Sequence, residues 1–523
     1  MSRGPGVRVG VDVGGTNTDA VVLAADLTLL AKAKVPTTEN VLDGVRDALA
    51  AAMGAAEVGP ADVHHVMVST THATNALIRR RGLRRVAVLR IGAPATLGIS
   101  VLSAWPQDVR DAVVAASEIV RGGAEVSGVP IVPLDVAAIE RFARSAAGEA
   151  DAFSVTGVFS PVTSEDEVIA REIIRSVAGD VPVSMSHEVG TIGLADRESA
   201  SALNAALTAV TQEVVDGVAE ALRTLKIAAR LYVAQNDGTL MAADWAVRCP
   251  VLTIGSGPAS SMRGAAYLSS LADAVVVDIG GTSTDIGVLT GGMPRSSASA
   301  IEIGGVRANF RMPDLLSLGL GGGSVVRMGP GGVVAGPDSV GGALTRSALV
   351  FGGDVPTLSD MAVARGRLTL GDPALAAAVD ERLHAVLDTV DARLAESIER
   401  IQRSSVNCPV VVVGGAGGLM TEVPPGCSEL IRPAHHDVAN AVGAAVAMIS
   451  REVDEVVPAG MDGREERLER LYQRARERTI AAGADPAGVE IAAVHETPLA
   501  YLLDPAVRIR VKAVGPLPGK AIS

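Results

Sequence analysis

A 15-residue pattern occurs twice in this 523-residue chain, as VGVDVGGTNTDAVVL over residues 9–23 and as VVVDIGGTSTDIGVL over residues 275–289. The two copies are identical at 10 of 15 aligned positions. Each copy is an apolar run that ends in aspartate, followed by two glycines, Thr-x-Thr-Asp and a second apolar run. This order predicts a strand, a tight turn and a second strand. The duplication predicts two related halves, each led by such a hairpin.

Each predicted turn has the composition of a phosphate-binding loop. Glycines can adopt positive φ, so the backbone N–H groups of a Gly-Gly turn can converge on an anion, and threonine hydroxyls add further donors. Two ordinary hairpin turns are the alternative, but turn formation alone does not require the flanking Asp and Thr-x-Thr-Asp. The expected phosphate-binding residues are Gly14, Gly15, Thr16, Thr18, Gly280, Gly281, Thr282 and Thr284.

An aspartate precedes each turn, at Asp12 and Asp278. A carboxylate beside a phosphate is repulsive unless a cation lies between them, and Mg²⁺, which keeps several of its waters, suits that position. We therefore expect Asp12 and Asp278 to hold Mg²⁺ and to act in catalysis, with ATP between the two turns. Asp19 and Asp285, which follow the turns, are expected to accept backbone N–H bonds that fix the turns.

Composition and charge exclude several other classes of protein. The net charge of −13 and the pI near 5.2 argue against a nucleic-acid partner, which requires a basic surface. No apolar run reaches the length of a membrane span, and the first residues carry no apolar leader, so we expect a cytoplasmic protein without a membrane partner. The three cysteines lack C-x-x-C spacing and are expected to be buried free thiols.

Alternating strand and helix patterns predict an α/β fold in three parts. Residues 1–193 are expected to form one α/β domain, residues 194–454 the second, and residues 455–523 a small C-terminal α+β module. The segment 437–450, DVANAVGAAVAMIS, is rich in small residues and predicts a helix made for close contact. Two α/β halves that each carry a phosphate turn imply a nucleotide cleft between them.

This arrangement resembles the actin-like ATPase superfamily, whose members have two ribonuclease H-like domains around a nucleotide cleft. The run VVVGGAGG at 411–418 is similar to the superfamily's adenosine motif, which implies that Gly414, Gly415, Gly417 and Gly418 contact the nucleoside. A GxxxxGK[ST] sequence does not occur, which excludes a P-loop mechanism.

At family level the chain resembles the hydantoinase A/5-oxoprolinase group. Besides the paired hairpins, the resemblance rests on STTHATNAL at 69–77, PVLTIGSGPASSMRGA at 250–265, SLGLGGGSV at 317–325 and VPTLSDMAVARGRL at 355–368. It implies an ATP-dependent subunit that opens a cyclic amide such as a hydantoin or 5-oxoproline, with a B-type hydrolytic subunit or a second copy of the chain as protein partners. The family's Cys-Tyr-Gly run is replaced near residue 345 by ALTRSALVFGG, so a nucleophilic cysteine is not expected.

Phosphoryl transfer from ATP to an amide oxygen explains why such an enzyme would need the paired turns, because this transfer requires mainly alignment and charge neutralisation. Three other functions stay open at this point. They are the ATP-using subunit of a ketone carboxylase, a small-molecule kinase, and a non-catalytic scaffold gated by nucleotide.

Several other polar residues have both a structural and a functional interpretation. His72, at the start of a predicted helix, either packs there or faces substrate as a catalytic residue, whereas Asn75 is expected to be structural. A metal site at His435, His436 and Asp437 is disfavoured, because adjacent histidines cannot share one helical face. Four further candidates are a cap or cleft residue at Asp360, a helix N-terminus at Ser256–Pro258 that could meet an anion, and cleft contacts from His187 and Glu188.

Overall fold

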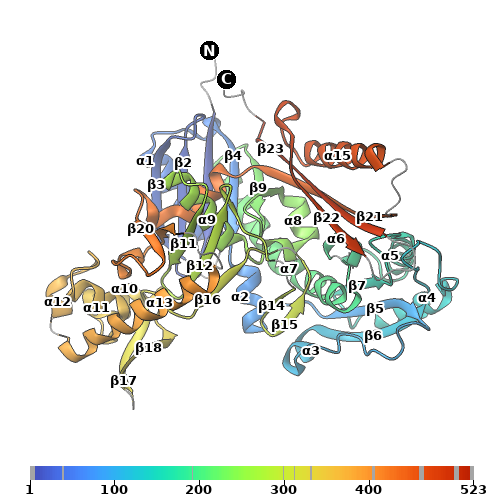
Figure 1. The fold of residues 1–523 in the computed structure, drawn as a ribbon, viewed down its shortest axis with the longest axis horizontal. Coiled ribbons are helices and arrows are strands. Elements are labelled where there is room, and N and C mark those ends of the chain that lie inside the picture. Colours follow the sequence, from blue (N-terminus) through green and yellow to red (C-terminus); the bar gives the residue numbers. More distant parts are fainter. Residues whose placement is uncertain are drawn as a thin grey trace.

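The computed structural model describes residues 6–37, 41–190, 192–297, 300–310, 312–329, 332–377, 379–402, 407–458, 464–499 and 506–518. Three larger β-sheets, each packed against helices, form the body of the molecule (Figure 1). Two of these sheets carry the duplicated hairpins, and the third is inserted between strands of the first.

The first sheet begins with the N-terminal hairpin. Strands β1 (Val7–Val13), β2 (Asn17–Leu23) and β3 (Leu29–Pro36) pair antiparallel, while β4 (Val63–Thr70) and β9 (Arg230–Ala234) continue the sheet in parallel with β1. The order β3-β2-β1-β4-β9, two antiparallel pairs followed by two parallel ones, is the ribonuclease H-like arrangement.

The second sheet repeats this topology strand for strand. Its order is β13-β12-β11-β19-β20, and β11 occupies the central place that β1 has in the first sheet. The strands are β11 (Ala274–Ile279), β12 (Thr284–Thr290), β13 (Met293–Pro294), β19 (Cys408–Val413) and β20 (Cys427–Ile431). The repeated order confirms the predicted α/β fold with two ribonuclease H-like halves.

Helices cover both faces of each repeated sheet. In the first half, α1 (Val41–Ala55) and α7 (Leu194–Thr224) pack on one face and α14 (Ala439–Val446) on the other. In the second half, α11 (Leu358–Ala364) and α13 (Val386–Gln402) cover one face and α9 (Ser256–Ser269) the other. Val, Ile, Leu and Ala fill these layers, as expected for a chain with 2% aromatic residues.

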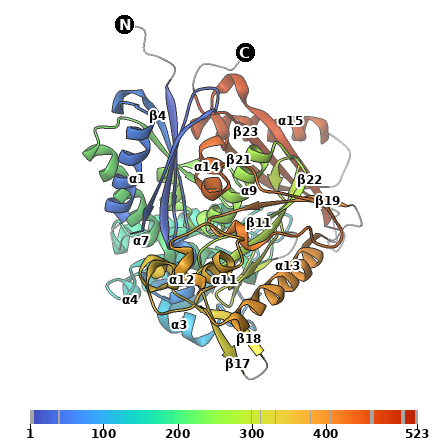
Figure 2. The same cartoon turned by 90° about the vertical axis from the view of Figure 1, so that its left-hand side faces the viewer.

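The helices α9 and α14 lie side by side between the two sheets (Figure 2). Their contact is made through glycines: a Cβ atom at Gly443 would lie 1.7 Å from the carbonyl oxygen of Ser260, and one at Gly264 would lie 1.9 Å from that of Ala439. Only glycine permits backbones to approach so closely. The close-contact helix predicted from small residues is thus confirmed.

The third sheet is an insertion with parallel strands only. Its order is β6-β5-β7-β8, formed by β5 (Val86–Ala93), β6 (Val114–Arg121), β7 (Ala152–Gly157) and β8 (Val183–Met185). The helices α4 (Val136–Ala146) and α5 (Glu165–Ala178) pack on it around Phe142 and Phe153. It interrupts the first half between α2 (His72–Arg79) and α7.

The edges of the first sheet differ from the boundaries expected at residues 193 and 454. Strands β9 and β10 (Leu240–Ala242) follow residue 193 yet belong to this sheet, and β21 (Ile449–Pro458) runs through residue 454. The C-terminal strands β22 (Glu490–Leu499) and β23 (Ala506–Gly515) extend the same sheet, with α15 (Arg464–Ala481) packed on them. Strand pairing between distant segments sets these limits, and a local sequence pattern does not reveal it.

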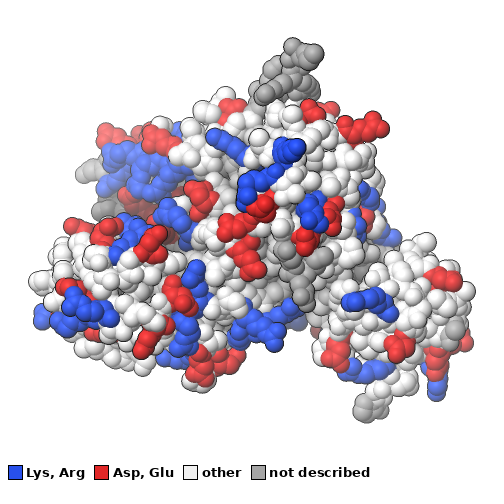
Figure 3. All heavy atoms as spheres, turned by 180° about the vertical axis from the view of Figure 1, so that it is seen from behind, with Lys and Arg blue, Asp and Glu red and all other residues white. Residues whose placement is uncertain are grey.

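Helix hydropathy and surface charge were both used in the sequence analysis, and the structure describes each of them. No helix in the described ranges is both long enough and apolar enough to cross a lipid bilayer. On the face turned away in Figure 1, basic and acidic side chains are interspersed (Figure 3).

Candidate nucleotide-binding site

The two duplicated turns face each other. Each is closed by one backbone hydrogen bond, from Gly14 N to Asn17 O at 3.1 Å and from Gly280 N to Ser283 O at 2.9 Å. A Cβ atom at Gly281 would lie 3.3 Å from Oγ1 of Thr16, so the turns meet across a narrow gap. The sequence prediction that paired turns lie opposite each other agrees with this geometry.

Asp12 is the penultimate residue of β1 and lies at the carboxyl edge of the first sheet. Its side chain is buried, with Oδ1 accepting a hydrogen bond from Ser69 Oγ at 2.5 Å and Oδ2 accepting one from Asn440 Nδ2 at 3.3 Å. Burial raises the pKa of Asp12 above its usual value, against the opposing effect of these two hydrogen bonds. Ser69 and Asn440 were not identified from the sequence.

Asp278 occupies the equivalent position near the end of β11. Burial raises its pKa to about 7, and the negative charges of Asp285 and Asp12 act in the same direction. A Cβ atom at Gly414 would lie 2.3 Å from Asp278 Oδ1, and Gly414 has a φ of 90°. Gly414 is therefore required both for the backbone conformation and for room beside this carboxylate.

A second aspartate lies directly opposite the first in each hairpin: Asp12 pairs with Asp19 and Asp278 with Asp285. Asp19 and Asp285 were expected to accept hydrogen bonds from backbone N–H groups of the turns. In the structure their carboxylates contact side chains instead. Lys34 Nζ lies 2.6 Å from Asp19, and Ser317 Oγ donates to Asp285. Because cross-strand neighbours point to the same face, their carboxylates meet side chains rather than the turn backbone.

Lys34 is the cation among these carboxylates. Burial raises the pKa of Asp19 to about 6, although Lys34 acts to lower it, and the charge of Lys34 also lowers the pKa of Asp12 and Asp278. The sequence LLAKAKVP of β3 carries the signal that could have identified it, since Lys32 and Lys34 alternate with apolar residues and share one face. Lys32 pairs with Asp437 instead, at 2.6 Å.

The four threonines of the turns divide into two pairs. Thr16 and Thr282 lie at the turns, with Thr282 exposed. Thr284 is buried and donates its hydroxyl hydrogen to the carbonyl oxygen of Leu320 at 2.6 Å, so it has no hydrogen left for a phosphate, contrary to its expected role. Thr18 is also buried, and its Oγ1 lies 3.3 Å from Thr37 Oγ1.

The glycines after β19 also divide. Gly415 is exposed, and no heavy atom lies within 4 Å of the place its Cβ would take. Gly417 and Gly418 are buried, and a Cβ atom at Gly418 would lie 2.5 Å from the carbonyl oxygen of Arg367. Of these four glycines, Gly415 is therefore the one with open backbone, whereas Gly414 packs against Asp278 and donates its N–H to the carbonyl oxygen of His436. Gly417 and Gly418 allow close packing within the second half rather than the contact expected of them.

Two further glycine segments complete the site. Gly322 N donates to the carbonyl oxygen of Gly280 at 2.9 Å, and Gly323 N donates to that of Gly281 at 2.6 Å. These two hydrogen bonds hold the backbone of the second turn in place. A Cβ atom at Gly342 would lie 3.7 Å from the carbonyl oxygen of Gly15, and one at Gly341 would lie 3.9 Å from Thr282 Oγ1. Residues 341–342 thus contact both turns, and no sequence motif had marked them.

The segment after β4 lies next to the first turn. His72 Nδ1 is 2.8 Å from Thr70 Oγ1, and burial lowers the pKa of His72. Asn75 is near the first turn, because a Cβ atom at Gly15 would lie 3.9 Å from its Nδ2. Ser256, the first residue of α9, donates to the carbonyl oxygen of Thr70 at 3.0 Å. The STTHATNAL motif and the start of α9 therefore adjoin each other, and a catalytic role for His72 stays a prediction.

The remaining candidates have structural partners. Asp360 is buried and caps α11, accepting from Thr357 N and Thr357 Oγ1, both at 2.7 Å. His436 Nδ1 lies 3.2 Å from the carbonyl oxygen of Gly414. Within the parts of the chain that the structure describes, no three His, Cys, Asp or Glu side chains are grouped to hold a metal ion, which includes residues 435–437.

The donor set nevertheless fits Mg²⁺ bound with a nucleotide. Mg²⁺ is usually held by one or two carboxylates together with phosphates and waters, rather than by an all-protein cage. Asp12 and Asp278, one from each half, supply that number of carboxylates, and Gly15 and Gly415 leave backbone open beside them. The site can therefore accept a triphosphate with its cation between the two halves.

A duplicated ribonuclease H-like fold with facing Asp-x-Gly-Gly-Thr turns is the fold of the actin-like ATPase class. Two family models match the chain: the model of the hydantoinase/oxoprolinase N-terminal region matches residues 8–178, and the hydantoinase/oxoprolinase model matches residues 197–384. The chain belongs to the hydantoinase/oxoprolinase family, as the sequence resemblance implied.

Two curated relatives extend the comparison. The gamma subunit of acetophenone carboxylase from Aromatoleum aromaticum is 28% identical over 399 residues, which is 68% of this chain and 53% of that protein. The uncharacterized protein MJ0964 of Methanocaldococcus jannaschii is 25% identical over 398 residues, 69% of this chain and 57% of that protein. The chain thus matches little more than half the length of each.

Two solved structures share the fold. A nucleotide-free acetone carboxylase has a TM-score of 0.74 with 19% identity, and the ATP-dependent caprolactamase from Pseudomonas jessenii has a TM-score of 0.73 with 21% identity. Each alignment covers 99% of this chain and 89% of the other.

Proposed function

We propose that this chain binds MgATP between its paired turns and transfers the γ-phosphoryl group to the oxygen of a cyclic amide, activating the ring for opening. The observation that carries the proposal is that Thr16 lies opposite Gly281, which brings the two duplicated turns, one from each half, to a common gap. The family membership and the fold shared with an ATP-dependent caprolactamase support an amide as the acceptor.

The chemistry explains the need for ATP. Resonance between nitrogen and carbonyl stabilises an amide. When the amide oxygen attacks the γ-phosphorus, ADP leaves, and the ring carbon becomes electrophilic because its oxygen can now depart as phosphate. Water then adds to that carbon, and the C–N bond breaks as nitrogen takes up a proton, which opens the ring and leaves an acyl phosphate. A second water hydrolyses the acyl phosphate to the carboxylate and free phosphate.

The residues of this chain would supply alignment and charge. Backbone N–H groups of Gly15 and Gly281, with the hydroxyls of Thr16 and Thr282, would hold the phosphates, while the N–H groups of Gly14 and Gly280 close the two turns. Asp12 and Asp278 would hold Mg²⁺, mostly through water, and the bound ion would neutralise the phosphate charge. Lys34, already among the carboxylates, would limit their mutual repulsion.

Phosphate release tests this function. The full chain, alone and with a B-type partner subunit, is incubated with ATP, Mg²⁺ and a panel of hydantoins, 5-oxoproline and larger lactams. The proposal predicts release that rises with one ring compound and disappears in Asp12→Asn. Release that no ring stimulates, with or without the partner, would contradict it.

A second candidate is the ATP-using subunit of a ketone carboxylase, favoured by the 28% identity to an acetophenone carboxylase subunit. The same assay separates the two, since ketone turnover would require bicarbonate and the lactam reaction would not. A phosphoester that persists in ³¹P NMR spectra would instead indicate a small-molecule kinase. Nucleotide binding that changes partner affinity with no substrate-dependent reaction would indicate a scaffold.

A further inference from the structure

The inserted third sheet has its own carboxyl edge. All four of its strands are parallel, so their carboxyl ends lie together, and ligands of open parallel α/β sheets bind in the crevice outside that edge. Strand β7 ends at Gly157, and β8 ends at Met185, directly before the short helix α6 (Ser186–Val189). His187 of α6 therefore lies at this edge, away from the paired turns.

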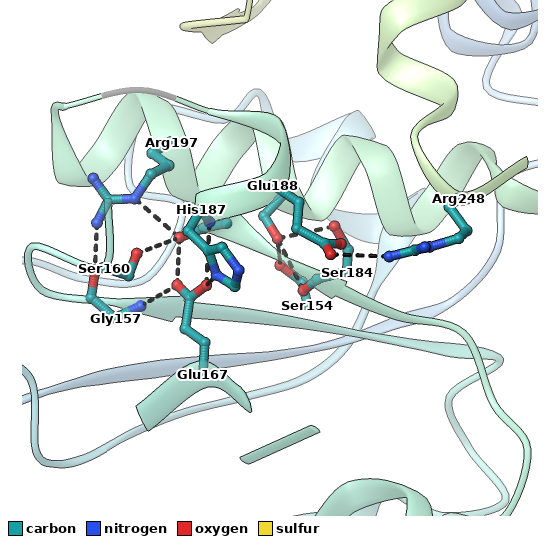
Figure 4. Close-up of polar contacts among 11 residues, drawn as sticks. Ser154, Gly157, Ser160, Glu167, Ser184, His187, Glu188, Arg197 and Arg248 are labelled. Carbon is teal, nitrogen blue, oxygen red and sulfur yellow. Dashed lines mark hydrogen bonds and ion pairs between the residues drawn. The ribbon is translucent and has the colours of Figure 1, made fainter. Parts of the chain in front are cut away.

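A buried carboxylate holds His187 in place (Figure 4). Glu167 is fully buried, and it accepts hydrogen bonds from Gly157 N at 2.7 Å, Ser186 Oγ at 2.5 Å, His187 N at 3.1 Å and His187 Nδ1 at 2.6 Å. Burial raises the pKa of Glu167, but the bond and charge of His187 and the charge of Arg197 outweigh it, so this pKa is lowered overall. Glu167 is thus ionised at neutral pH.

This network fixes which ring nitrogen of His187 is available. An ionised Glu167 only accepts, so His187 Nδ1 carries the hydrogen, and Nε2 is the nitrogen with a free lone pair when the ring is neutral. The His187 side chain is 20% exposed and lines a cavity of about 930 Å³. No hydrogen bond to Nε2 is formed by the residues that the structure describes.

The cavity lies between the third sheet, the β9–β10 loop and the C-terminal β21 and α15. None of its lining residues comes from the paired turns or from 414–418. Its volume falls in the range of small-molecule pockets. Several of its charges are paired within the protein, as in Lys512 with Asp237 at 2.6 Å and in Arg474 with Glu455.

Arg451 differs from those paired cations. Its guanidinium lies over the ring of Trp245, with its central carbon 4.6 Å from the ring centre, and it forms no hydrogen bond or ion pair with a carboxylate in the described part of the chain. Burial lowers the pKa of Arg451 to about 10, against the opposing effect of Cys249 and Asp244. A cation that has lost water and lacks a bonded counterion gains free energy from an incoming anion.

We propose that this cavity is a second ligand site for a small organic carboxylate, which binds the Arg451 guanidinium through its carboxylate and His187 Nε2 through a second polar group. A planar guanidinium matches a carboxylate with two parallel hydrogen bonds, and stacking on Trp245 keeps its orientation. The site goes beyond the proposed function, because it requires neither ATP nor phosphoryl transfer.

Calorimetry on the full chain tests the site with glutarate and hippurate, each beside its neutral amide. The acids should bind and the amides should bind at least about tenfold more weakly. Arg451→Gln should weaken acid binding by about tenfold or more, and His187→Asn, which keeps an N–H toward Glu167 but lacks Nε2, should weaken hippurate binding about fivefold. Arg470→Gln is the control, since it makes the same charge change on an exposed part of α15.

Three results would overturn the proposal: no binding of either acid to the unaltered protein, equal binding of acids and amides, or wild-type acid binding by a folded Arg451→Gln protein. Thermal unfolding of each variant establishes that it is folded. MgATP titrations of the same samples are read separately, so loss of the acid site is distinguished from failure of the nucleotide site. Asp12→Asn should leave acid binding unchanged.

Discussion

Ser69 of β4 lies directly opposite Asp12 of β1 in the parallel register and donates a 2.5 Å hydrogen bond to its carboxylate. The bond orients a buried acid at the edge where the two halves meet. Together with the bond from Asn440, it keeps Asp12 in one conformation, and no cation in the parts of the chain that the structure describes forms an ion pair with Asp12.

Asp12→Asn should separate binding from folding. The amide can still accept from Ser69 and no longer carries a buried charge, so the melting temperature should be unchanged or higher. Loss of the cation-binding carboxylate should weaken MgATP binding by about tenfold or more, which is at least about 1.4 kcal/mol. Calorimetry and thermal unfolding measure the two effects, and a variant that binds MgATP like the wild type would contradict the role of Asp12.

Lys34→Met should also weaken nucleotide binding. The substitution removes the ammonium group that lies 2.6 Å from Asp19. The charge of this group opposes the rise in the pKa of Asp12, Asp19 and Asp278. The uncompensated carboxylates should repel the triphosphate, with a loss of about tenfold. Lys32→Met, on the same face of β3 but paired with Asp437, is the matched control and should change affinity less than Lys34→Met.

Stability of the nucleotide-free protein should depend on Asp278 through pH. Its pKa is raised from 3.8 to about 7 on folding, so between these values the folded state binds more protons than the unfolded state. The free energy of unfolding therefore falls as pH rises through this window. Urea unfolding at pH 5 and pH 8, without Mg²⁺, should show a smaller decline for Asp278→Asn than for the wild type. Equal declines would contradict the raised pKa.

The contact of α9 and α14 should tolerate no added carbon. In Gly443→Ala the new Cβ atom would lie 1.7 Å from the Ser260 carbonyl oxygen, so the helices must separate. We expect a loss of about 2 kcal/mol or more in the free energy of unfolding. Gly54→Ala in α1, where nothing lies within 4 Å, should instead stabilise by up to about 1 kcal/mol. Urea unfolding compares the two, and equal effects would contradict the packing account.

The sequence revealed the paired turns because their pattern is local and occurs twice. Gly-Gly after Asp12 and Asp278 predicts a turn without knowledge of the rest of the chain, and repetition identifies two halves. The small residues of 437–450 predicted a close helix contact for the same reason. The expected fold class followed from these local signals.

Partners that come from distant segments could not be predicted in this way. The hydroxyl of Thr284 looks free in the sequence, but Leu320 of a later segment accepts its hydrogen. Likewise, the sequence gives no sign that the backbone of Arg367 packs against Gly418 and takes the space in which a nucleoside could contact it. The assignment of β9 and β21 to the first sheet has the same origin, because hydrogen bonds between distant strands decide it.

The central claim is that the two turns hold one MgATP from opposite sides, and calorimetry with Gly281→Val tests it most directly. The Cβ atom of valine would lie 3.3 Å from Thr16 Oγ1, so its methyl groups would fill the space beside this hydroxyl where the phosphates are expected. Thermal unfolding establishes that the variant is folded. The wild type should bind one non-hydrolysable ATP analogue with Mg²⁺, and the folded variant should bind at least about tenfold more weakly. Equal affinities in the two proteins, or no heat of binding in the wild type, would contradict the claim.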